Sequence, residues 1–422
     1  MLFLYKVLTN LIIIFSPLII IYRLLIKKEH PNRFVEKFCI PSNKKLSGKL
    51  VWFHGSSVGE ILSIVPLIEI INKRNDVKQI LVTSSTLSSS FVLKNIKLKK
   101  VIHQFFPIDT NYFSKKFLNY WKPSVVIFIE SEIWPNMINN IKKNSIPLIL
   151  LNARITKKSF NRWKSIQSFS EKIFGSFDFT YPQNFETKKY LKILGAKNIK
   201  LIGNLKFSEN EINKSNEIKS RLKKFFNNKK IWCATSTHDT EEEICVQTHK
   251  KLNMKYKNLL TIIIPRHIHR AKKIADEIKN LGLQVHFHSS NDKIKKNTEI
   301  YLVDTYGETK SFFKICKTVF LGGSIIQHGG QNPLESIRFG CNIIHGPNVK
   351  NFEEIYNLLK KNGLSVKINN SHQLSEALNK SFGKKANSTK KIKKLKKLRK
   401  KILDMTYREI EYYINKNEFK KT

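Results

Sequence analysis

Short apolar runs alternate with longer amphipathic segments along most of the chain, and this rhythm most restricts how it can fold. The segments between the runs, such as 61–71 and 271–281, carry apolar residues at helical spacing. Strand–helix alternation is typical of parallel sheets covered by helices on both faces. We therefore predict a doubly wound α/β fold. The expected strands are 50–53, 79–83, 125–129, 147–151, 231–234, 259–264, 299–303 and 318–321.

A polar segment rich in Lys and Asn, residues 208–230, divides this pattern into two halves. The length of 422 residues suits two or three domains, and each half has the size of one doubly wound domain. In such domains a ligand binds in the crevice at the carboxyl ends of the strands. The expected division is an N-terminal anchor 1–28, a first domain 29–207, a second domain 208–375 and basic C-terminal helices 376–422.

The N-terminal segment is uncharged from residue 7 to residue 22, and Arg23, Lys27 and Lys28 follow it. A cleavable signal peptide would carry its basic residues mainly in front, with a small-residue cleavage site behind. The run is slightly shorter than the roughly 20 residues of a full span, so it can span with snorkelling ends or lie in the membrane interface. The basic cluster behind it predicts that the remaining chain is cytoplasmic. A buried helix is disfavoured because we find no polar face.

The formal charge of +44 is compatible with nucleic acid, anionic membranes or phosphorylated substrates as partners. The excess is mostly Lys in a chain crowded with Ile and Asn, which a biased genome composition can also produce. Five scattered cysteines without a CxxC pair indicate neither a zinc site nor a disulfide framework. The basic tail 384–401 has apolar residues at helical spacing, which fits a solvated closing helix or contact with an anionic bilayer.

A polar motif follows the first expected strand and precedes a helix: His54-Gly-Ser-Ser57-Val-Gly59-Glu60. Glu60 would lie in the first helical turn, where the helix dipole stabilises a carboxylate. A carboxylate that faces the crevice from a strand end is also suited to act as a general base, taking a proton from a hydroxyl. The motif alone leaves both roles open.

Two further polar motifs follow strands of the first half. Glu130 and Glu132 come after the strand 125–129, and because residues two apart cannot share a helix face, one should face the crevice and the other brace the turn. A capping role ahead of the next helix is the alternative. Asn152 and Arg154 come after the next strand. Arg154 could bind a phosphate or carboxylate, or pair with one of the two glutamates.

Similar motifs follow two strands of the second half, namely Ser236-Thr237-His238-Asp239 and Pro265-Arg266-His267. Capping by the hydroxyls and Asp239 would explain the first motif locally, while the exposed amides of the helix that begins there would suit a phosphate. Arg266 would point across the carboxyl edge of the sheet, where an anionic ligand belongs.

Glycines cluster in one place, since six of the chain's 16 lie within 322–346. The cluster contains the motifs Gly322-Gly323-Ser324 and Asn332-Pro333-Leu334-Glu335. Asn332 would cap a helix that starts at Pro333, and a glycine-rich loop running into a helix start is suited to bind an anion. Glu335 in the first turn could reach a ribose hydroxyl. Neither GxxxxGK(S/T) nor GxGxxG occurs, which argues against a P-loop kinase and a standard dinucleotide enzyme.

The order of these motifs resembles one known family over nearly the whole chain. Behind an N-terminal anchor come S-V-G-E, E-S-E-I-W-P-N, N-A-R, G-N-L-K, S-T-H, P-R-H, G-G-S and G-G-Q-N-P-L-E. This order is similar to that of the 3-deoxy-D-manno-octulosonic acid (Kdo) transferases of lipopolysaccharide synthesis. The resemblance implies a membrane-associated glycosyltransferase with the two-domain GT-B architecture.

The resemblance also implies a reaction: transfer of Kdo from CMP-Kdo to the glucosamine disaccharide of the lipid A precursor lipid IVA, with inversion and without a cofactor or an obligatory metal. Glu60 matches the family's catalytic base. The first domain would receive the acceptor, with its cleft residues Ser57, Gly59, Glu130, Glu132, Asn152 and Arg154. The second would bind CMP-Kdo through Ser236, Thr237, His238, Pro265, Arg266, His267, Gly322, Gly323, Ser324, Asn332 and Glu335.

The implied location is the cytoplasmic face of the inner membrane, with a single N-terminal anchor, phospholipid contact and no specific nucleic acid partner. Two positions depart from the family pattern, since Gln331 stands where His is usual and Thr240 where Gly is common. Two alternatives remain: another GT-B enzyme such as a nucleotide-sugar epimerase, and a membrane-tethered basic protein that binds nucleic acid. The second is disfavoured because the Lys residues are spread throughout the chain.

Overall fold

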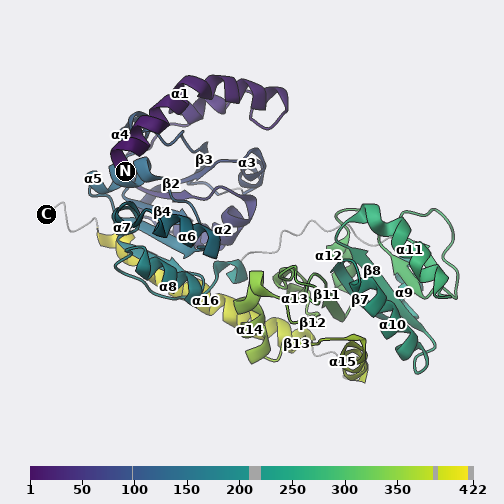
Figure 1. Ribbon diagram of the computed structural model, residues 1–422. Coiled ribbons are helices and arrows are strands. Elements are labelled where there is room, and N and C mark those ends of the chain that lie inside the picture. Colours follow the sequence, from purple (N-terminus) through teal and green to yellow (C-terminus); the bar gives the residue numbers. More distant parts are fainter. Residues whose placement is uncertain (97, 209–219, 384–387, 417–422) are drawn as a thin grey trace. The chain divides into compact units, whose positions relative to one another are not determined.

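The computed structural model describes residues 1–96, 98–208, 220–383 and 388–416, and it divides into two compact units (Figure 1). Unit 1 comprises Met1–Asn210 with Leu398–Thr422, and unit 2 comprises Glu211–Lys397. Each unit is built on its own parallel sheet, which confirms the predicted α/β fold with two doubly wound domains. Residues 209–219 of the predicted dividing segment 208–230 lie outside the described residues, and α9 (Ser220–Asn227) forms a helix within its last part.

The sheet of unit 1 has six strands in the order β3-β2-β1-β4-β5-β6, and all neighbours are parallel. Its strands are β1 (Lys49–His54), β2 (Val77–Ser84), β3 (Val101–Phe105), β4 (Val125–Ile129), β5 (Leu148–Ala153) and β6 (Phe179–Pro182). The chain order reverses between β1 and β4, which is the position at which ligands bind in open α/β sheets. Central strand β4 is the continuous apolar run Val-Val-Ile-Phe-Ile and is buried along its length, as expected for a parallel strand covered on both faces.

Helices cover this sheet on both sides. They are α2 (Val58–Asn72), α3 (Leu87–Lys94), α4 (Asn111–Trp121), α5 (Pro135–Lys143), α6 (Lys157–Lys164), α7 (Gln167–Phe174) and α8 (Phe185–Ile193), with the short 3-10 helices η1 (Phe34–Phe38) and η2 (Leu205–Ser208). One core joins Trp52 of β1 to Phe117 of α4, Ile138 of α5 and Phe169 of α7. This packing fixes the positions of the strands, and so of the loops that follow them, relative to the helices.

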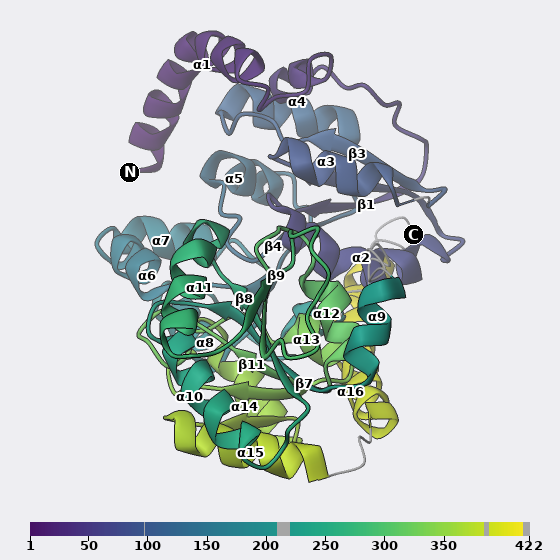
Figure 2. The same ribbon diagram turned by 90° about the vertical axis from the view of Figure 1, so that its right-hand side faces the viewer.

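The N-terminal segment forms one long helix, α1 (Leu2–Leu25), which lies beside α4 (Figures 1 and 2). In the described part of the chain it is the one helix long and apolar enough to cross a membrane. Contrary to the expectation of no polar face, Thr9 is buried and accepts a hydrogen bond from Asn136 at 3.0 Å, and the Tyr5 hydroxyl donates to Asp109 at 2.9 Å. The helix is therefore docked on unit 1 near its start.

Unit 2 carries a seven-stranded sheet in the order β13-β12-β11-β7-β8-β10-β9, again wholly parallel. Its strands are β7 (Lys230–Thr237), β8 (Leu259–Pro265), β9 (Val285–Phe287), β10 (Ile300–Leu302), β11 (Thr318–Leu321), β12 (Asn342–His345) and β13 (Ser365–Lys367). The order reverses between β7 and β11, so the expected ligand position of this unit lies at the carboxyl ends of these two strands.

The remaining helices are α10 (Glu241–Asn253), α11 (Ala271–Asn280), α12 (Thr309–Ile315), α13 (Leu334–Arg338), α14 (Glu353–Lys361), α15 (Ser371–Gly383) and α16 (Ser388–Lys416). Helices α10, α11 and α15 pack on one face of the second sheet through a core that includes Trp232 and Phe320. The described part of the basic tail, from residue 388 on, is helical as predicted, and α16 begins in unit 2 but contributes its last part to unit 1. There Glu411 pairs with Arg74 at 2.8 Å, and Ile410 is fully buried.

Candidate functional site

The predicted residues of the first half lie at the carboxyl ends of three adjacent strands. Glu60 and Ser57 follow β1, Glu132 follows β4, and Asn152 ends β5. Because β1 and β4 flank the point where strand order reverses, the sheet brings these side chains to the place where α/β domains bind ligands.

Glu60 closes a hydrogen-bonded turn at the start of α2. The Ser57 hydroxyl accepts from the Glu60 amide at 3.3 Å and donates to its Oε1 at 2.9 Å, while the Ser56 amide donates to its Oε2 at 2.7 Å. This is the capping arrangement expected for Ser and Glu three residues apart. A Cβ at position 55 would lie 3.2 Å from the Cβ of Glu60, so glycine lets the turn close. A Cβ at position 59 would meet nothing within 4 Å, so packing does not require Gly59.

The carboxylate of Glu60 is only partly buried, and its surroundings favour the protonated form. Burial raises the pKa of Glu60, and the nearby negative charge of Glu132 raises it further, whereas the hydrogen bonds from Ser57 and Ser56 act in the opposite direction. A cap that only stabilised the helix would gain nothing from a raised pKa. A group that must accept a proton does gain, because basicity rises with pKa.

Behind Glu60 lies a buried polar chain that the sequence analysis did not assign. The Glu132 carboxylate accepts from Trp134 Nε1 at 2.8 Å and lies 2.9 Å from His54 Nε2, and His54 Nδ1 lies 3.0 Å from the Thr83 hydroxyl. With the proton on Nε2, His54 accepts from Thr83 and donates to Glu132, which satisfies both ring nitrogens. Burial alone would raise the pKa of Glu132, but the His54 and Trp134 hydrogen bonds outweigh it and hold that pKa below its usual value.

Glu130 is buried beside Glu132 but has different partners. Its carboxylate pairs with Lys206 Nζ at 2.7 Å, and Asn152 Oδ1 accepts from the Leu205 amide at 3.1 Å, so η2 is tied to the ends of β4 and β5. In the described residues Arg154 makes no ion pair with Glu130 or Glu132. Lys206, and not Arg154, forms the ion pair with Glu130. Sequence reasoning quoted Lys206 within a motif but gave it no role.

Backbone strain marks the same strand ends. Glu130, Asn152 and Ser236 follow or end β4, β5 and β7, and each has φ near +55°, in the left-handed region that non-glycine residues rarely adopt. Such conformations persist only where surrounding structure enforces them, and they cluster at functional sites. Thr240 has φ of 71°, which explains why glycine suits this position.

In unit 2 the glycine-rich loop is already occupied by a side chain of the protein. Glu241 is fully buried, and its two carboxylate oxygens accept from the backbone amides of Gly323 at 2.6 Å, Ser324 at 3.0 Å and Ile325 at 2.9 Å. The glycine-rich loop was predicted to bind an anion of the donor, and these three amides already bind the Glu241 carboxylate. Any anion that binds here must use other groups.

Capping, one of the two roles expected for the turn after β7, is not observed. Among the described residues no side chain caps α10, and Asp239 instead pairs with Arg270 at 2.8 Å, which also pairs with Glu242 at 3.0 Å. The Asn332 prediction was close: its Oδ1 accepts from the Leu334 amide at 3.1 Å, and α13 begins at Leu334, one residue later than expected.

Cationic and imidazole side chains gather at the carboxyl ends of β7, β8 and β11. The His238 ring lies 4.2 Å from that of His328 and 5.9 Å from that of His267, while Arg266 and His267 are exposed. Burial and the positive charges around it lower the pKa of His238 to about 4. Among the described residues its buried Nε2 has no hydrogen-bond partner, so this atom can donate to or accept from a ligand. Exposed Asn332 and half-buried Glu335 belong to the loop and helix beyond, and Glu335 lies 3.4 Å from Lys310.

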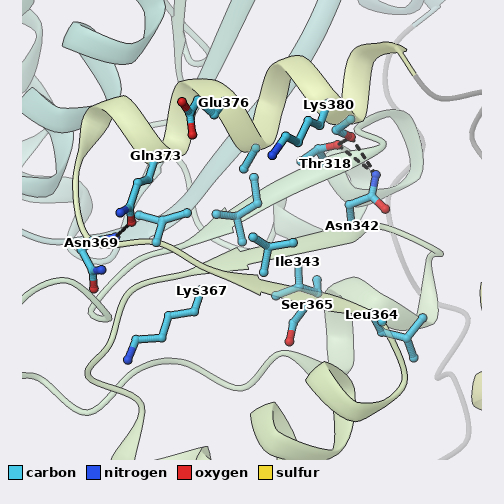
Figure 3. A pocket seen from close by; sticks show the side chains of 16 residues that line it. Thr318, Asn342, Ile343, Leu364, Ser365, Lys367, Asn369, Gln373, Glu376 and Lys380 are labelled. Carbon is cyan, nitrogen blue, oxygen red and sulfur yellow. Dashed lines mark hydrogen bonds between the residues drawn. The ribbon is translucent and has the colours of Figure 1, made fainter.

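A cavity of unit 2, about 770 Å³, lies away from this group, between α15 and the strands β12 and β13 (Figure 3). Its wall includes a hydrogen-bonded set of Thr318, Ser381 and Asn342. None of the predicted site residues lines it. In the described ranges no three His, Cys, Asp or Glu side chains come together in a way that could hold a metal ion.

Two parallel sheets with ligand-binding strand ends define the GT-B class of fold. The chain is similar to the crystal structure of a putative UDP-N-acetylglucosamine 2-epimerase from Listeria monocytogenes, with a TM-score of 0.54 over 82% of this chain and 91% of that one. The sequence identity is 12%, so this likeness concerns the fold alone. A nucleotide-sugar epimerase, the alternative considered above, therefore has the same fold as this chain, and the fold alone does not favour that activity.

Sequence relatives define the family. Residues 32–209 match the family described as 3-deoxy-D-manno-octulosonic-acid transferase (kdotransferase). The chain is 35% identical over 375 residues to a 3-deoxy-D-manno-octulosonic acid transferase of Rickettsia bellii, covering 89% of each chain. It is 30% identical over 361 residues to that of Haemophilus influenzae, covering 83% of this chain and 84% of the relative. The chain therefore belongs to the Kdo transferase family of glycosyltransferases.

Proposed function

We propose that this protein transfers Kdo from CMP-Kdo to the glucosamine disaccharide of lipid IVA, with inversion at the anomeric carbon and Glu60 as general base. Membership of the family supports the donor sugar and the reaction type. The observation that carries the assignment of the base is the Glu60 carboxylate itself: it is partly exposed at the strand-order switch of unit 1, and its pKa is raised.

In this mechanism the ionised Glu60 takes the proton of an acceptor hydroxyl, the freed oxygen attacks the anomeric carbon of Kdo, and CMP departs. Ser57 and the Ser56 amide hold one carboxylate oxygen each, so the orientation of the base is fixed before the acceptor arrives. In this proposal the acceptor approaches past Gly59, where a Cβ would meet nothing within 4 Å.

We place the donor at the strand ends of unit 2. The departing CMP phosphate would gain negative charge, and Arg266, His267 and His238 are the donors available to stabilise it there. Since the loop amides are taken by Glu241, these side chains carry the anion contact in this proposal. The nucleoside would lie toward Asn332 and Glu335.

We further propose that α1 holds the protein on the cytoplasmic face of the inner membrane by lying in the interface. Leu8, Phe15 and Leu18 are each more than half exposed, whereas Tyr5 and Thr9 are bonded to unit 1. A helix that spanned the bilayer would have to draw the Tyr5 and Thr9 contacts, and with them part of unit 1, into hydrocarbon.

This topology can be tested with inverted membrane vesicles and an N-terminal tag. An interfacial α1 leaves the tag open to added protease on the same side as unit 1, whereas a protected tag would refute the interfacial arrangement. The double variant Leu8→Glu/Phe15→Glu should lose binding to anionic vesicles. Leu46→Glu, at an exposed apolar residue of unit 1 that lies outside α1, serves as the matched control.

The activity is tested by incubating purified protein with CMP-Kdo, generated in situ, and a tetraacylated lipid A precursor. Mass spectrometry of the lipid should show a gain of one or more Kdo units. No gain under conditions in which an established Kdo transferase works would contradict the proposal.

A further inference from the structure

Glu241 is the meeting point of two strand-end loops of unit 2. Besides the amides of Gly323, Ser324 and Ile325, its carboxylate accepts from the backbone amide of His238 at 3.0 Å. Four converging amides form the kind of concave nest that usually binds a phosphate or another anion. Here the anion is a side chain of the protein, and it is completely shielded from solvent.

The loop around this carboxylate has no space for a larger side chain at position 322. A Cβ at position 322 would lie 2.5 Å from the Ser236 carbonyl oxygen and 2.8 Å from Glu241 Oε2, so only glycine fits there. The Ser324 hydroxyl accepts from the Gly346 amide at 2.8 Å, and the Gly323 carbonyl accepts from the Gly330 amide at 2.7 Å. Glu241 thus holds the turn 322–325. That turn fixes the loop after β12 through Gly346 and the glycine pair 329–330 through Gly330.

The opposite side of the loop faces the imidazole group. A Cβ built at Gly323 would lie 3.2 Å from both the His238 and the His328 rings and 3.3 Å from Gln331 Nε2. The Glu241 carboxylate is on the inner side of the loop, and the side chains available to a ligand are on the outer side. A shift of the loop would therefore move two things at once: the turn that carries His238, and the backbone at Gly323 that contacts the His238 and His328 rings.

We propose that Glu241 is a positioning residue for the sugar-nucleotide donor: its carboxylate takes the place of a bound phosphate in the amide nest and holds the loop 322–325 and the His238 turn in the shape that the donor meets. The inference rests on the proposed function, because it assumes that unit 2 binds the donor. The adjacent glutamates do not share this role, since Glu242 pairs with Arg270 and Glu243 is exposed.

Glu241→Gln tests the charge at constant size, because an amide NH₂ cannot accept from a backbone amide. Hydrogen exchange of the peptide 318–330 without any ligand should be faster in the variant. The KM for CMP-Kdo should rise about tenfold, equivalent to losing about 1.4 kcal/mol, while kcat at saturating donor stays within about threefold. Glu241→Asp, which keeps the carboxylate on a shorter stem, should fall between the variant and the wild type. Glu243→Gln is the matched control and should behave as wild type.

Unchanged exchange together with an unchanged KM would overturn the proposal, as would a loss confined to kcat. Exchange of β8 and α11 reports global unfolding, and a Glu241→Gln variant that loosened these elements equally would mark Glu241 as a general fold determinant and also count against the proposal. Failure of the proposed function looks different: wild-type protein would then neither bind CMP nor use CMP-Kdo. The donor role of Glu241 would fall with it, whereas the ligand-free exchange experiment would still report whether Glu241 orders the loop.

Discussion

Glu60 in unit 1 and Glu241 in unit 2 occupy equivalent places in two similar sheets, yet their surroundings differ. Each lies in the first turn of the helix that follows the first strand of its sheet, beside the strand-order switch. Glu241 is buried under four backbone amides, while Glu60 is partly exposed and its pKa is raised. The Glu241 carboxylate is fully bound by the backbone, whereas the Glu60 carboxylate can be reached by a ligand. The topology of the sheet therefore places both carboxylates at strand ends, and their neighbours determine which of them can react.

The largest expected effect falls on Glu60, and it tests whether this carboxylate differs from a purely structural one. Glu60→Gln should lower the rate of Kdo transfer roughly 100- to 10,000-fold, the usual contribution of a general base, while CMP binding is retained. Single-turnover lipid assays and calorimetry with CMP measure the two quantities. Glu69→Gln on the same helix is the control. Near-normal turnover of Glu60→Gln would remove Glu60 from the mechanism and make it a second structural cap.

A smaller effect is expected when the charge behind Glu60 is removed. Glu132→Gln takes away a negative charge that raises the pKa of Glu60, so that pKa falls and the acid limb of the kcat/KM profile moves to lower pH. Glu130→Gln should move the limb in the same direction but less, because Glu130 contributes less to that shift. A limb that stays in place in Glu132→Gln would mean that another group sets it.

In unit 2 the corresponding pH effect is on stability. The pKa of His238 is lowered from 6.5 to about 4, so between these pH values the unfolded chain binds a proton that the folded chain does not. Stability from this group is therefore present above pH 6.5 and is lost as the pH falls toward 4. His238→Gln should reduce the drop in Tm across that window, in part only, because His249 and His345 have similarly lowered pKa values. Gln331→Asn, a neighbouring change without titration, should leave the drop as it is.

The smallest effect concerns the strained residue next to Glu241. Thr240 is β-branched and has φ of 71°, so Thr240→Gly should relieve strain and, after the entropy that glycine gains in the unfolded chain, stabilise the protein by about 1 kcal/mol. Urea unfolding measures this. Thr309→Gly in the first turn of α12 is the opposite control and should destabilise by about 0.3 kcal/mol, the difference between the helix propensities of Thr and Gly. Destabilisation by both would show that position 240 is not strained.

Local patterns predicted much of the fold. All eight expected strands are present, because continuous apolar runs such as that of β4 leave little else open. The strands that were missed are short or contain polar residues: β3 includes His103 and Gln104, and β9 and β13 have three residues each. Pairing with a neighbouring strand, and not local composition, makes these segments extended.

The candidate site was predicted in position but not in its connections. Strand-end motifs identified Glu60 and Glu132, yet the partner of Glu132, His54, lies 78 residues away along the chain. Glu241 was given no role, and the loop amides it binds are 82 to 84 residues further on. No local signal distinguishes Glu241 from Glu242 or Glu243, because only the packed sheet decides which of them points at the loop.

The discontinuous makeup of unit 1 has a consequence for its synthesis. Its last helical segment, in α16, supplies buried Ile402, Ile410 and Ile414, and the Tyr181 hydroxyl donates to Glu409 at 3.0 Å. A ribosome delivers this segment only after the whole of unit 2 has been made. Unit 1 therefore keeps apolar surface uncovered until this segment of α16 emerges, later than all of its other segments.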